Sequence, residues 1–519
     1  MKNFVCFLLI YFSVLSLFAQ HTNIEISSNN SPEEPSIAVN PNNTNELIAG
    51  SNIDNVYFST DGGITWTENV LTSTFGVWGD PVIIFDVEGD AYFFHLANPQ
   101  QGNWIDRIVC QKTTDGGLSW NNGSYAGLNG TKAQDKEWAI VDRSDNTIYM
   151  TWTEFDSYGS SSPSDFSNIM FSKSVDGGET WTDALKINEV SGDCIDDDNT
   201  VEGAVPALGI NGEVYVAWAG PEGIVFDKSL DKGATWLDED IFVTDFPNGW
   251  AFDIPGISRC NGLPITACDT SGLAYNGTIY INWSDQRNGA LDTDVWLIKS
   301  NDGGETWGEP IRVNNDEAGK QQFFTWMAID QMTGYLYFVF YDRRNHNDNK
   351  TDVYMAVSTD GGETFNNFKV SETPFLPNPN VFFGDYTNLT AHNNVVRPIW
   401  ARLNNSQLSV LTAIIDVESV IVTNFQEIVQ EDFLLENYPN PFSSETYYSF
   451  KLRRESEVNL YVSDVYGRTV CNLISSEVLP TGKYVKSFNN ERIKLPSGVY
   501  YFVLETAFKK EVRKFIIIE

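Results

Sequence analysis

One octapeptide recurs six times along this chain of 519 residues, and it constrains the fold more than any other feature. Each copy starts with Ser or Thr, has Asp third and Gly fifth, and ends with Trp or Phe. The copies span residues 59–66, 113–120, 174–181, 229–236, 300–307 and 358–365. Their Asp residues, at 61, 115, 176, 231, 302 and 360, are 54, 61, 55, 71 and 58 positions apart. Self-similarity at such a period predicts an array of repeated supersecondary units.

The chemistry of the octapeptide is local. Its Asp carboxylate can accept hydrogen bonds from nearby backbone N–H groups and from the Ser or Thr hydroxyl, and its Gly supplies a turn position with positive φ. The terminal aromatic ring can then pack against the adjoining sheet. We therefore interpret the octapeptide as a device that fixes a strand–turn–strand unit, and we assign no catalysis to its Asp residues.

Two further strands are expected before each octapeptide. Candidate innermost strands start at Pro35, Asp80, Glu137, Ala204, Cys268, Thr325 and Gly384. Second strands share an aromatic position, as in Tyr149–Trp152 and Tyr280–Trp283. The last repeat has no octapeptide. About four strands fit one period, so we predict seven units over residues 24–425, with six as the alternative.

The octapeptides resemble the Asp-boxes, or BNR repeats, of sialidase-like β-propellers. The resemblance implies an all-β protein whose first domain is a seven-bladed propeller, or a six-bladed one as in typical sialidases. It says less about activity, because one propeller scaffold can host many functions.

Composition marks a second domain. Residues 431–519 hold 12 Lys and Arg against 12 Asp and Glu, so the first 430 residues hold 21 against 58 and carry the whole net charge of −37. Such acidity argues against binding of nucleic acids, which needs a basic surface. Residues 1–19 have the pattern of a signal peptide, and no later apolar run is long enough to cross a membrane. We expect a linker over residues 426–436 and a small β-sandwich over 437–519.

That C-terminal segment resembles a type A sorting domain of the type IX secretion system of Bacteroidetes. The matching motifs are ENYPNPF from Glu436, DVYGR from Asp464, LPTG from Leu479, LPSGVYY from Leu495 and the final strand KFIII. The resemblance implies handling by the type IX machinery and passage across the outer membrane. The mature protein would then be extracellular or attached to the cell surface, and we expect a monomer.

Export permits disulfides. We expect Cys260 to pair with Cys268 across a short loop, with Cys194 as a competitor for either. The acidic segment Asp193–Asn199 suggests calcium, because Ca²⁺ prefers dense oxygen ligands, although a solvated loop explains it equally well. No other cofactor is indicated.

The loops that enter the first strands and those that follow the second strands should meet at one face of a propeller. They carry carboxylates and guanidinium groups, which suit acid–base chemistry on a glycan and binding of an anionic substituent. The predicted catalytic residues are Asp80, Glu137, Asp385 and Tyr386. The predicted substrate-binding residues are Arg287, Asp342, Arg343, Arg402 and His95. We interpret Glu34 and Glu202 as rim charges.

The sequence leaves the function open between several classes. The first hypothesis is a glycoside hydrolase-like enzyme acting on acidic polysaccharide or glycoconjugate. The second is a surface protein that binds glycans or proteins without catalysis. A polysaccharide lyase using His95 is a lesser alternative. The Arg-Ile-Pro motif of sialidases is absent, which argues against an exo-sialidase, so whether the protein is an enzyme stays open.

Overall fold

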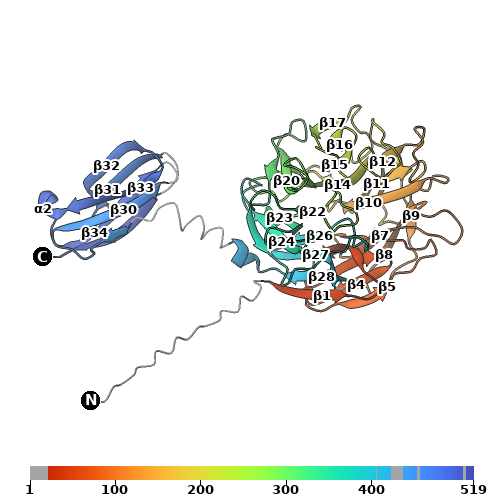
Figure 1. The fold of residues 1–519 in the computed structure, drawn as a ribbon, viewed down its shortest axis with the longest axis horizontal. Coiled ribbons are helices and arrows are strands. Elements are labelled where there is room, and N and C mark those ends of the chain that lie inside the picture. Colours follow the sequence, from red (N-terminus) through yellow and green to blue (C-terminus); the bar gives the residue numbers. More distant parts are fainter. Residues whose placement is uncertain (1–20, 405, 422–435, 453–455, 507–509, 519) are drawn as a thin grey trace, which may run out of the picture. The chain divides into compact units, whose positions relative to one another are not determined.

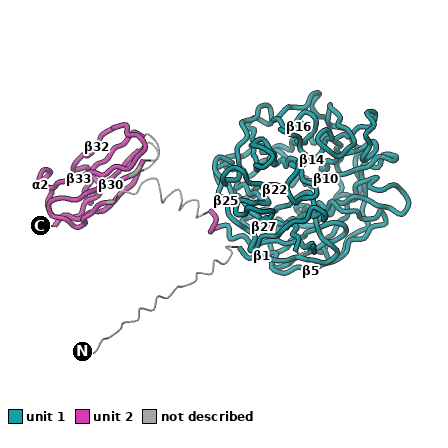
Figure 2. Tube along the Cα trace, viewed as in Figure 1, with its two compact units in different colours: residues 1–417 teal, residues 418–519 magenta. Residues whose placement is uncertain are grey.

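The computed structural model describes residues 21–404, 406–421, 436–452, 456–506 and 510–518. The predicted signal peptide and nearly all of the predicted linker lie outside these residues. The chain divides into two compact units, Met1–Val417 and Glu418–Glu519 (Figures 1 and 2). Among the described residues, no helix is long and apolar enough to cross a membrane.

Within its described residues, the first unit forms seven four-stranded antiparallel sheets, consistent with propeller blades. The first sheet comprises β2 (Glu33–Val39), β3 (Leu47–Asn52), β4 (Asn55–Ser59) and β5 (Thr67–Val70). The second comprises β6 (Val82–Phe85), β7 (Ala91–Leu96), β8 (Ile108–Thr113) and β9 (Ser124–Ala126). The third comprises β10 (Ala133–Val141), β11 (Ile148–Phe155), β12 (Ser167–Ser174) and β13 (Leu185–Lys186).

The remaining four sheets repeat this order. The fourth comprises β14 (Glu202–Leu208), β15 (Val214–Gly220), β16 (Gly223–Ser229) and β17 (Ile241–Thr244). The fifth comprises β18 (Ile265–Cys268), β19 (Ile279–Asp285), β20 (Asp294–Ser300) and β21 (Ile311–Arg312). The sixth comprises β22 (Gln322–Asp330), β23 (Tyr335–Asp342), β24 (Asp352–Ser358) and β25 (Asn366–Lys369). The seventh comprises β26 (Asn388–His392), β27 (Val395–Asn404), β28 (Gln407–Ile414) and β1 (Thr22–Ser27).

The sheets close into a ring through the ends of the unit. Strand β1 pairs antiparallel with β28, where Thr22 lies opposite Ile414. The first strand of each sheet lies beside that of the next, as β10 and β14 do in Figure 1, and β2 contacts both β6 and β26. The innermost strands therefore surround one axis, and the loops that precede them gather at one end of it.

The octapeptides have the structural role that the sequence predicts. In the first copy, Asp61 Oδ1 accepts hydrogen bonds from the Ser59 hydroxyl at 2.9 Å and from the Thr65 N–H at 2.9 Å. Asp61 Oδ2 accepts the Thr65 hydroxyl at 2.7 Å, and the Trp66 indole donates to the Gly63 carbonyl at 3.0 Å. The same Asp contacts recur at Asp115, Asp176, Asp231, Asp302 and Asp360.

Basic side chains link neighbouring sheets at these turns. Lys228 donates to the Gly303 carbonyl of the next octapeptide at 2.8 Å, and Lys299 reaches the Gly361 carbonyl at 2.9 Å. In the last sheet Arg397 donates to the Gly62 carbonyl of the first octapeptide at 2.8 Å. The octapeptide therefore fixes its own turn and also supplies an acceptor for the preceding sheet.

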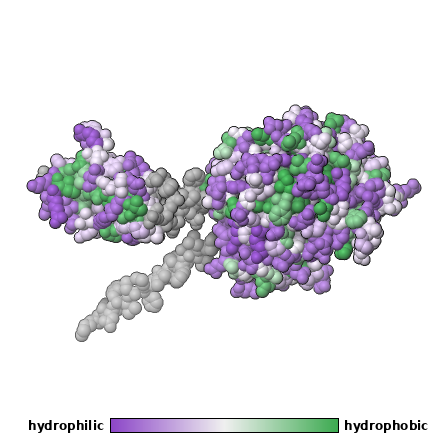
Figure 3. Space-filling view, turned by 90° about the horizontal axis from the view of Figure 1, so that it is seen from above, coloured by the Kyte–Doolittle hydropathy of each residue, from purple (hydrophilic) through white to green (hydrophobic). Residues whose placement is uncertain are grey.

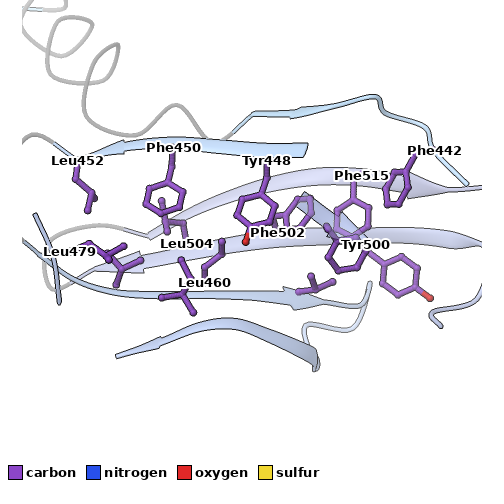
Figure 4. Close-up of a cluster of buried hydrophobic side chains, with 14 of the residues drawn as sticks. Phe442, Tyr448, Phe450, Leu452, Leu460, Leu479, Tyr500, Phe502, Leu504 and Phe515 are labelled. Carbon is purple, nitrogen blue, oxygen red and sulfur yellow. The ribbon is translucent and has the colours of Figure 1, made fainter. Parts of the chain in front are cut away.

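The second unit has two sheets that share one apolar core. One sheet has β29 (Glu436–Tyr438), β30 (Glu445–Leu452) and β33 (Gly482–Asn489); the other has β32 (Thr469–Leu479), β31 (Ser456–Ser463), β34 (Gly498–Thr506) and β35 (Lys510–Ile517). A short helix, α2 (Asn490–Ile493), follows β33. The rings of Phe502 and Phe515 lie 4.3 Å apart in the core, with Tyr448 and Leu460 beside them (Figure 4).

The cysteine prediction needs correction. All five described cysteines are free thiols. Cys260 lies in the loop before β18 and Cys268 ends that strand, so the extended strand β18 holds the two thiols apart. Both are buried.

Surface hydropathy fits the acidic composition. Hydrophilic residues predominate on the face of the first unit drawn in Figure 3, with apolar patches among them.

Candidate active site

Residues with positive φ lie in or just before the first part of several innermost strands. Glu34, Asp80, Lys136 and Phe324 have φ values of 46°, 51°, 52° and 50°, a region that non-glycine residues seldom adopt. The strand register shifts at three of these places, in β2, β10 and β22. Bulges and positive φ angles redirect side chains and often occur next to active sites. Here they bring charged side chains from separate sheets together.

Lys136 is the centre of this cluster. Its Nζ lies 3.3 Å from Asp80 Oδ2 and 3.2 Å from Asp385 Oδ2, although the three residues come from different sheets. The three side chains are buried. Burial alone would lower the pKa of Lys136, but the two carboxylates hold it well above its usual value. Lys136 is therefore a buried cation that compensates two buried anions.

Arg259 covers the same carboxylate from the solvent side. Its Nε donates to Asp385 Oδ1 at 3.0 Å, and its Nη2 contacts Asp385 Oδ2. Its Nη1 reaches Asp196 Oδ2 at 2.9 Å, which also accepts the Tyr158 hydroxyl at 2.6 Å. Burial alone would raise the pKa of Asp385, but Lys136 and Arg259 lower it. Asp385 is therefore held as an anion.

Other carboxyl groups of the cluster have raised pKa values, in contrast to Asp385. Burial, followed by repulsion from neighbouring carboxylates, raises the pKa of Glu33 to about 8. Burial raises the pKa of Asp135 to about 8, and it raises those of Glu34 and Glu137 well above their usual values. Asp80 differs, because Lys136 and hydrogen bonds with Glu34 and Asp135 outweigh burial and lower its pKa. Neutral carboxylic acids thus lie beside an ionised carboxylate.

Some carboxylate oxygens in the cluster have no hydrogen-bond partner. Both oxygens of Glu137 are buried and unpartnered among the described residues, as are Oε2 of Glu33 and Oε1 of Glu202. Glu137 and Glu202 are each 1% exposed, whereas Glu33 is half-buried. Glu33 therefore combines a raised pKa with partial exposure of the residue, although its unpartnered Oε2 is buried.

A small cavity lies beneath the cluster. It measures about 30 Å³ and is lined by Lys136, Trp138, Trp326, Asp385 and Tyr386, among others. The rings of Trp138 and Trp326 lie 4.3 Å apart, and Tyr386 lies 5.4 Å from Trp138. A cavity of this size holds about one water molecule and no sugar ring. A larger ligand must therefore meet the cluster from the solvent side.

Exposed aromatic rings lie on loops at that same end. Trp78 and Trp104 are 38% and 44% exposed, and their rings lie 6.3 Å apart. Trp104 is 5.5 Å from Tyr158, whose hydroxyl belongs to the Asp196–Arg259 network. Phe382 is 37% exposed and lies 5.4 Å from the Arg259 guanidinium. These four rings, which we call the aromatic row, provide apolar ring surface next to the carboxyl cluster, and Trp104 packs edge to face against both Trp78 and Tyr158.

The structure brings the four predicted catalytic residues into one cluster. Asp80 and Asp385 bind Lys136, Tyr386 lines the cavity, and Glu137 interacts with Asp80. Glu34 and Glu202 are corrected from rim charges to buried members of the cluster, because the bulges turn them inward.

The sequence does not predict four other members of the cluster: Glu33, Asp135, Lys136 and Arg259. Their positions beside predicted innermost strands were the one available signal. The bulges with positive φ, which turn charged side chains toward the axis, cannot be recognised from one sequence.

The predicted anion clamp does not form. Arg287 binds Asp285 of its own sheet at 2.6 Å, and Arg402 binds Glu25 at 2.7 Å. Arg343 is 4% exposed and is held by the Thr351 hydroxyl and the Pro255 carbonyl. The fourth member, Asp342, is fully buried and binds Arg344 at 2.7 Å. These residues are corrected from substrate ligands to ion pairs and buried contacts within the scaffold.

The role predicted for His95 also needs correction. His95 is fully buried, and its ring nitrogens meet the Leu96 carbonyl at 2.8 Å and Gln111 Oε1 at 3.1 Å. Burial lowers its pKa to about 4, so it is a neutral core residue that no substrate can reach. The carboxylates of Asp193–Asn199 bind separate partners, and no described group of three or more His, Cys, Asp or Glu side chains is placed to hold a metal ion.

Comparison with known families supports the two-part organisation. Residues 436–518 match the Secretion system C-terminal sorting domain, and residues 57–68, which contain the first octapeptide, match the BNR/Asp-box repeat. The chain therefore carries an Asp-box repeat in its first unit and a type IX sorting domain at its C-terminal end, which indicates a secreted protein. A search of curated proteins found no match.

Solved structures that match parts of this chain include a sialidase and an α-L-arabinanase. The Hadza microbial sialidase Hz136 is 15% identical, over 72% of this chain and 74% of its own, with a TM-score of 0.42. The α-L-arabinanase of Penicillium chrysogenum is 16% identical over 66% and 99%, with a TM-score of 0.40. A protein of unknown function from Dyadobacter fermentans is 12% identical over 76% and 97%, with a TM-score of 0.43. These similarities carry no information on the substrate of this chain.

Proposed function

We propose that this protein is a secreted glycoside hydrolase whose active site is the carboxyl cluster around Lys136. One observation carries the proposal. Carboxyl groups with pKa values shifted in opposite directions lie within the same cluster, and Glu33 and Asp80 represent the two directions. Hydrolysis of a glycosidic bond needs such a pair, because one group gives a proton to the leaving oxygen while the other acts as an anion.

Glu33 is the proposed proton donor. Its pKa of about 8 keeps it protonated at neutral pH and lies near the value at which proton transfer is most effective. Asp80 is the proposed anion, because Lys136 and the neutral acids beside it keep it ionised. Burial raises the pKa of Tyr386 well above 10, which favours hydrogen-bond donation by its phenol over nucleophilic attack.

The surroundings of the cluster favour a neutral glycan over an acidic one. The arginines that could clamp a carboxylate or sulfate are already paired within the scaffold. The excess of acidic side chains in the first 430 residues, 58 against 21 basic ones, would repel an anionic substrate. The aromatic row offers ring faces on which the apolar face of a sugar can pack.

The test is release of reducing ends from a panel of neutral, amino and acidic oligosaccharides by the full secreted chain. We expect activity on a neutral glycan, and we expect Glu33→Gln and Asp80→Asn each to lower kcat at least 100-fold. Asp115→Asn, in an octapeptide turn, is the matched carboxylate control and should retain activity. Absorbance of unsaturated uronate, measured in parallel, would show a lyase instead.

Two results would contradict the hydrolase. One is a folded protein that releases no reducing ends from any member of the panel. The other is full activity of both Glu33→Gln and Asp80→Asn. The exposed aromatic row supports a second candidate, a glycan-binding protein without catalysis. Retention on an immobilised glycan without any cleavage would favour it.

A further inference from the structure

A second and larger cavity runs along the axis of the first unit. It measures about 850 Å³ and is lined by residues from the innermost strand of every sheet. Trp138 and Trp326 line both this cavity and the small one beneath the carboxyl cluster. Its other lining residues extend to the far ends of the strands, at Arg143, Ile210, Met332 and His392. We call this cavity the axial channel; the indole pair lies between it and the proposed active site.

Apolar and polar groups share the wall of the axial channel almost equally. Half-buried apolar side chains project from successive innermost strands at Ala38, Ile84, Ile140, Leu208 and Ala267. The volume lies in the range of small-molecule binding sites, which typically combine apolar walls with a few polar groups. At the end remote from the tryptophans, Ile210 and Met332 are 53% and 59% exposed. Apolar surface thus continues from the wall to the mouth.

The mouth carries a cation without a partner. Among the described residues, Arg143 has neither an ion pair nor a hydrogen bond. Its neighbour Asp142 binds Lys232 at 3.2 Å, so that carboxylate is already engaged. Asp330, on the far side of the mouth, accepts backbone N–H groups from Asn393 and Asn394. Arg143 is exposed, so its guanidinium is accessible to an incoming group.

His392 lies on the opposite side of the ring from the third sheet and nevertheless interacts with Arg143. Burial and the Arg143 charge lower its pKa, so it is neutral at pH 7. The positive charge at the mouth therefore resides on Arg143 at neutral pH. An anionic group that enters the mouth meets a guanidinium with free N–H donors, which bind carboxylates in a bidentate manner.

We propose that the axial channel binds a small monocarboxylate with an apolar body, whose carboxylate pairs with Arg143 and whose apolar part lies against the channel wall. Charge and shape both point to this class. A neutral apolar molecule leaves Arg143 unpaired, and a small anion such as acetate leaves the wall uncovered. The proposal does not depend on glycoside hydrolysis, because the indole pair lies between the two sites.

The test uses the full secreted chain and isothermal titration with decanoate, with decanol and acetate as comparison ligands. We expect decanoate to bind and both comparison ligands to bind at least 10-fold more weakly. Arg143→Ala should weaken decanoate at least 10-fold. Arg402→Ala, which removes an arginine of β27 that pairs with Glu25 of the outermost strand β1, is the matched control and should leave decanoate binding unchanged.

Channel-filling variants test the location. Ile140→Trp should abolish decanoate binding, and Ala267→Leu, a smaller change for the case that Ile140→Trp does not fold, should weaken it. Sugar hydrolysis by Arg143→Ala should equal that of the unmodified protein, which separates this proposal from the proposed function. The proposal is overturned by absence of decanoate binding, by equal binding to Arg143→Ala, by equal binding of decanol, or by undiminished binding to the folded channel-filling variants.

Discussion

The Lys136 ammonium lies 3.2 Å from Asp385 Oδ2, although 249 positions separate the two residues (385 − 136 = 249). Lys136 belongs to the third sheet, and Asp385 precedes the first strand of the seventh. The same ammonium binds Asp80, just before the second sheet. A single buried cation therefore joins three sheets at the axis, and the proposed chemistry depends on the geometry that closure of the ring provides.

Replacement of Lys136 by an uncharged residue should destabilise the folded protein. In Lys136→Met, Asp80 and Asp385 would remain buried without their shared cation, and loss of one partner from a buried ion pair costs about 3–5 kcal/mol. We expect a loss of that size in the free energy of unfolding in urea at pH 7. Lys350→Met, which removes an exposed lysine paired with the exposed Asp348, is the control and should change little. A loss below about 1 kcal/mol in Lys136→Met would contradict this account.

Asp135 should make stability fall as pH rises. Its pKa is about 8 in the folded protein and 3.8 is its ordinary value, so between these values the folded chain holds a proton that the unfolded chain has released. Raising the pH through this window therefore favours unfolding. Asp135→Asn keeps an N–H donor for Asp80 and removes the titration. We expect urea unfolding of this variant to depend less on pH between 5 and 8.

The pKa of Glu33 is also raised, so Glu33 too makes stability fall as pH rises. The pH dependence of unfolding should therefore be reduced in Asp135→Asn but not eliminated. Asp385 has the opposite sign: its pKa is lowered, and its contribution to stability is lost as pH falls through that lowered value. If the unmodified protein and Asp135→Asn showed the same pH slope between 5 and 8, Asp135 would not be protonated in the folded state.

The aromatic row should contribute to ligand binding and little to folding. Trp104 is 44% exposed, so Trp104→Ala should leave the melting temperature almost unchanged. Loss of its ring face should weaken binding of the preferred glycan roughly 10-fold, which corresponds to about 1.4 kcal/mol. Phe242→Ala provides an exposed aromatic control on the outer strand β17, where Phe242 is 56% exposed. Equal binding by both variants would exclude the aromatic row from the site.

Much of the fold could be predicted because the octapeptide encodes it locally. Ser59 and Asp61 form their turn through contacts within a few residues, so the sequence pattern alone specifies the geometry. The candidate site could be predicted only in part. Asp80 and Asp385 were found from their positions before innermost strands, and these positions do converge.

The partners of these carboxylates could not be predicted in the same way. The backbone at Lys136 has a positive φ that no neighbouring residue signals, and this bulge turns its ammonium to the axis. The predicted arginine clamp does not form for a related reason. Arg287 follows Asp285 by two positions, so its guanidinium binds this neighbouring carboxylate and is not free for a ligand. Local ion pairs compete with site formation, and sequence spacing alone does not show which prevails.

The octapeptide Asp residues should matter for stability and not for activity. Asp302 accepts the Ser300 and Thr306 hydroxyls and the Thr306 N–H, and these hydrogen bonds lower its pKa to about 2. Asp302→Ala removes the acceptors from a solvent-facing turn, so we expect a fall in melting temperature of roughly 2 °C. Sugar hydrolysis measured well below that temperature should be unchanged. A strong loss of activity at full stability would assign Asp302 a role in the chemistry.

The C-terminal unit should direct export on its own. Residues 436–518 match a secretion sorting domain, and this part of the chain has its own apolar core around Phe502 and Phe515. A secreted reporter protein fused to residues 418–519 should therefore appear outside the outer membrane of a host that has the type IX machinery. Phe515→Asp places a charge in the buried core and should abolish export of the fusion. Lys510→Ala, at an exposed position of strand β35, is the control and should be exported normally. Export of the Phe515→Asp fusion at the normal level would show that a folded sorting domain is not what the machinery recognises.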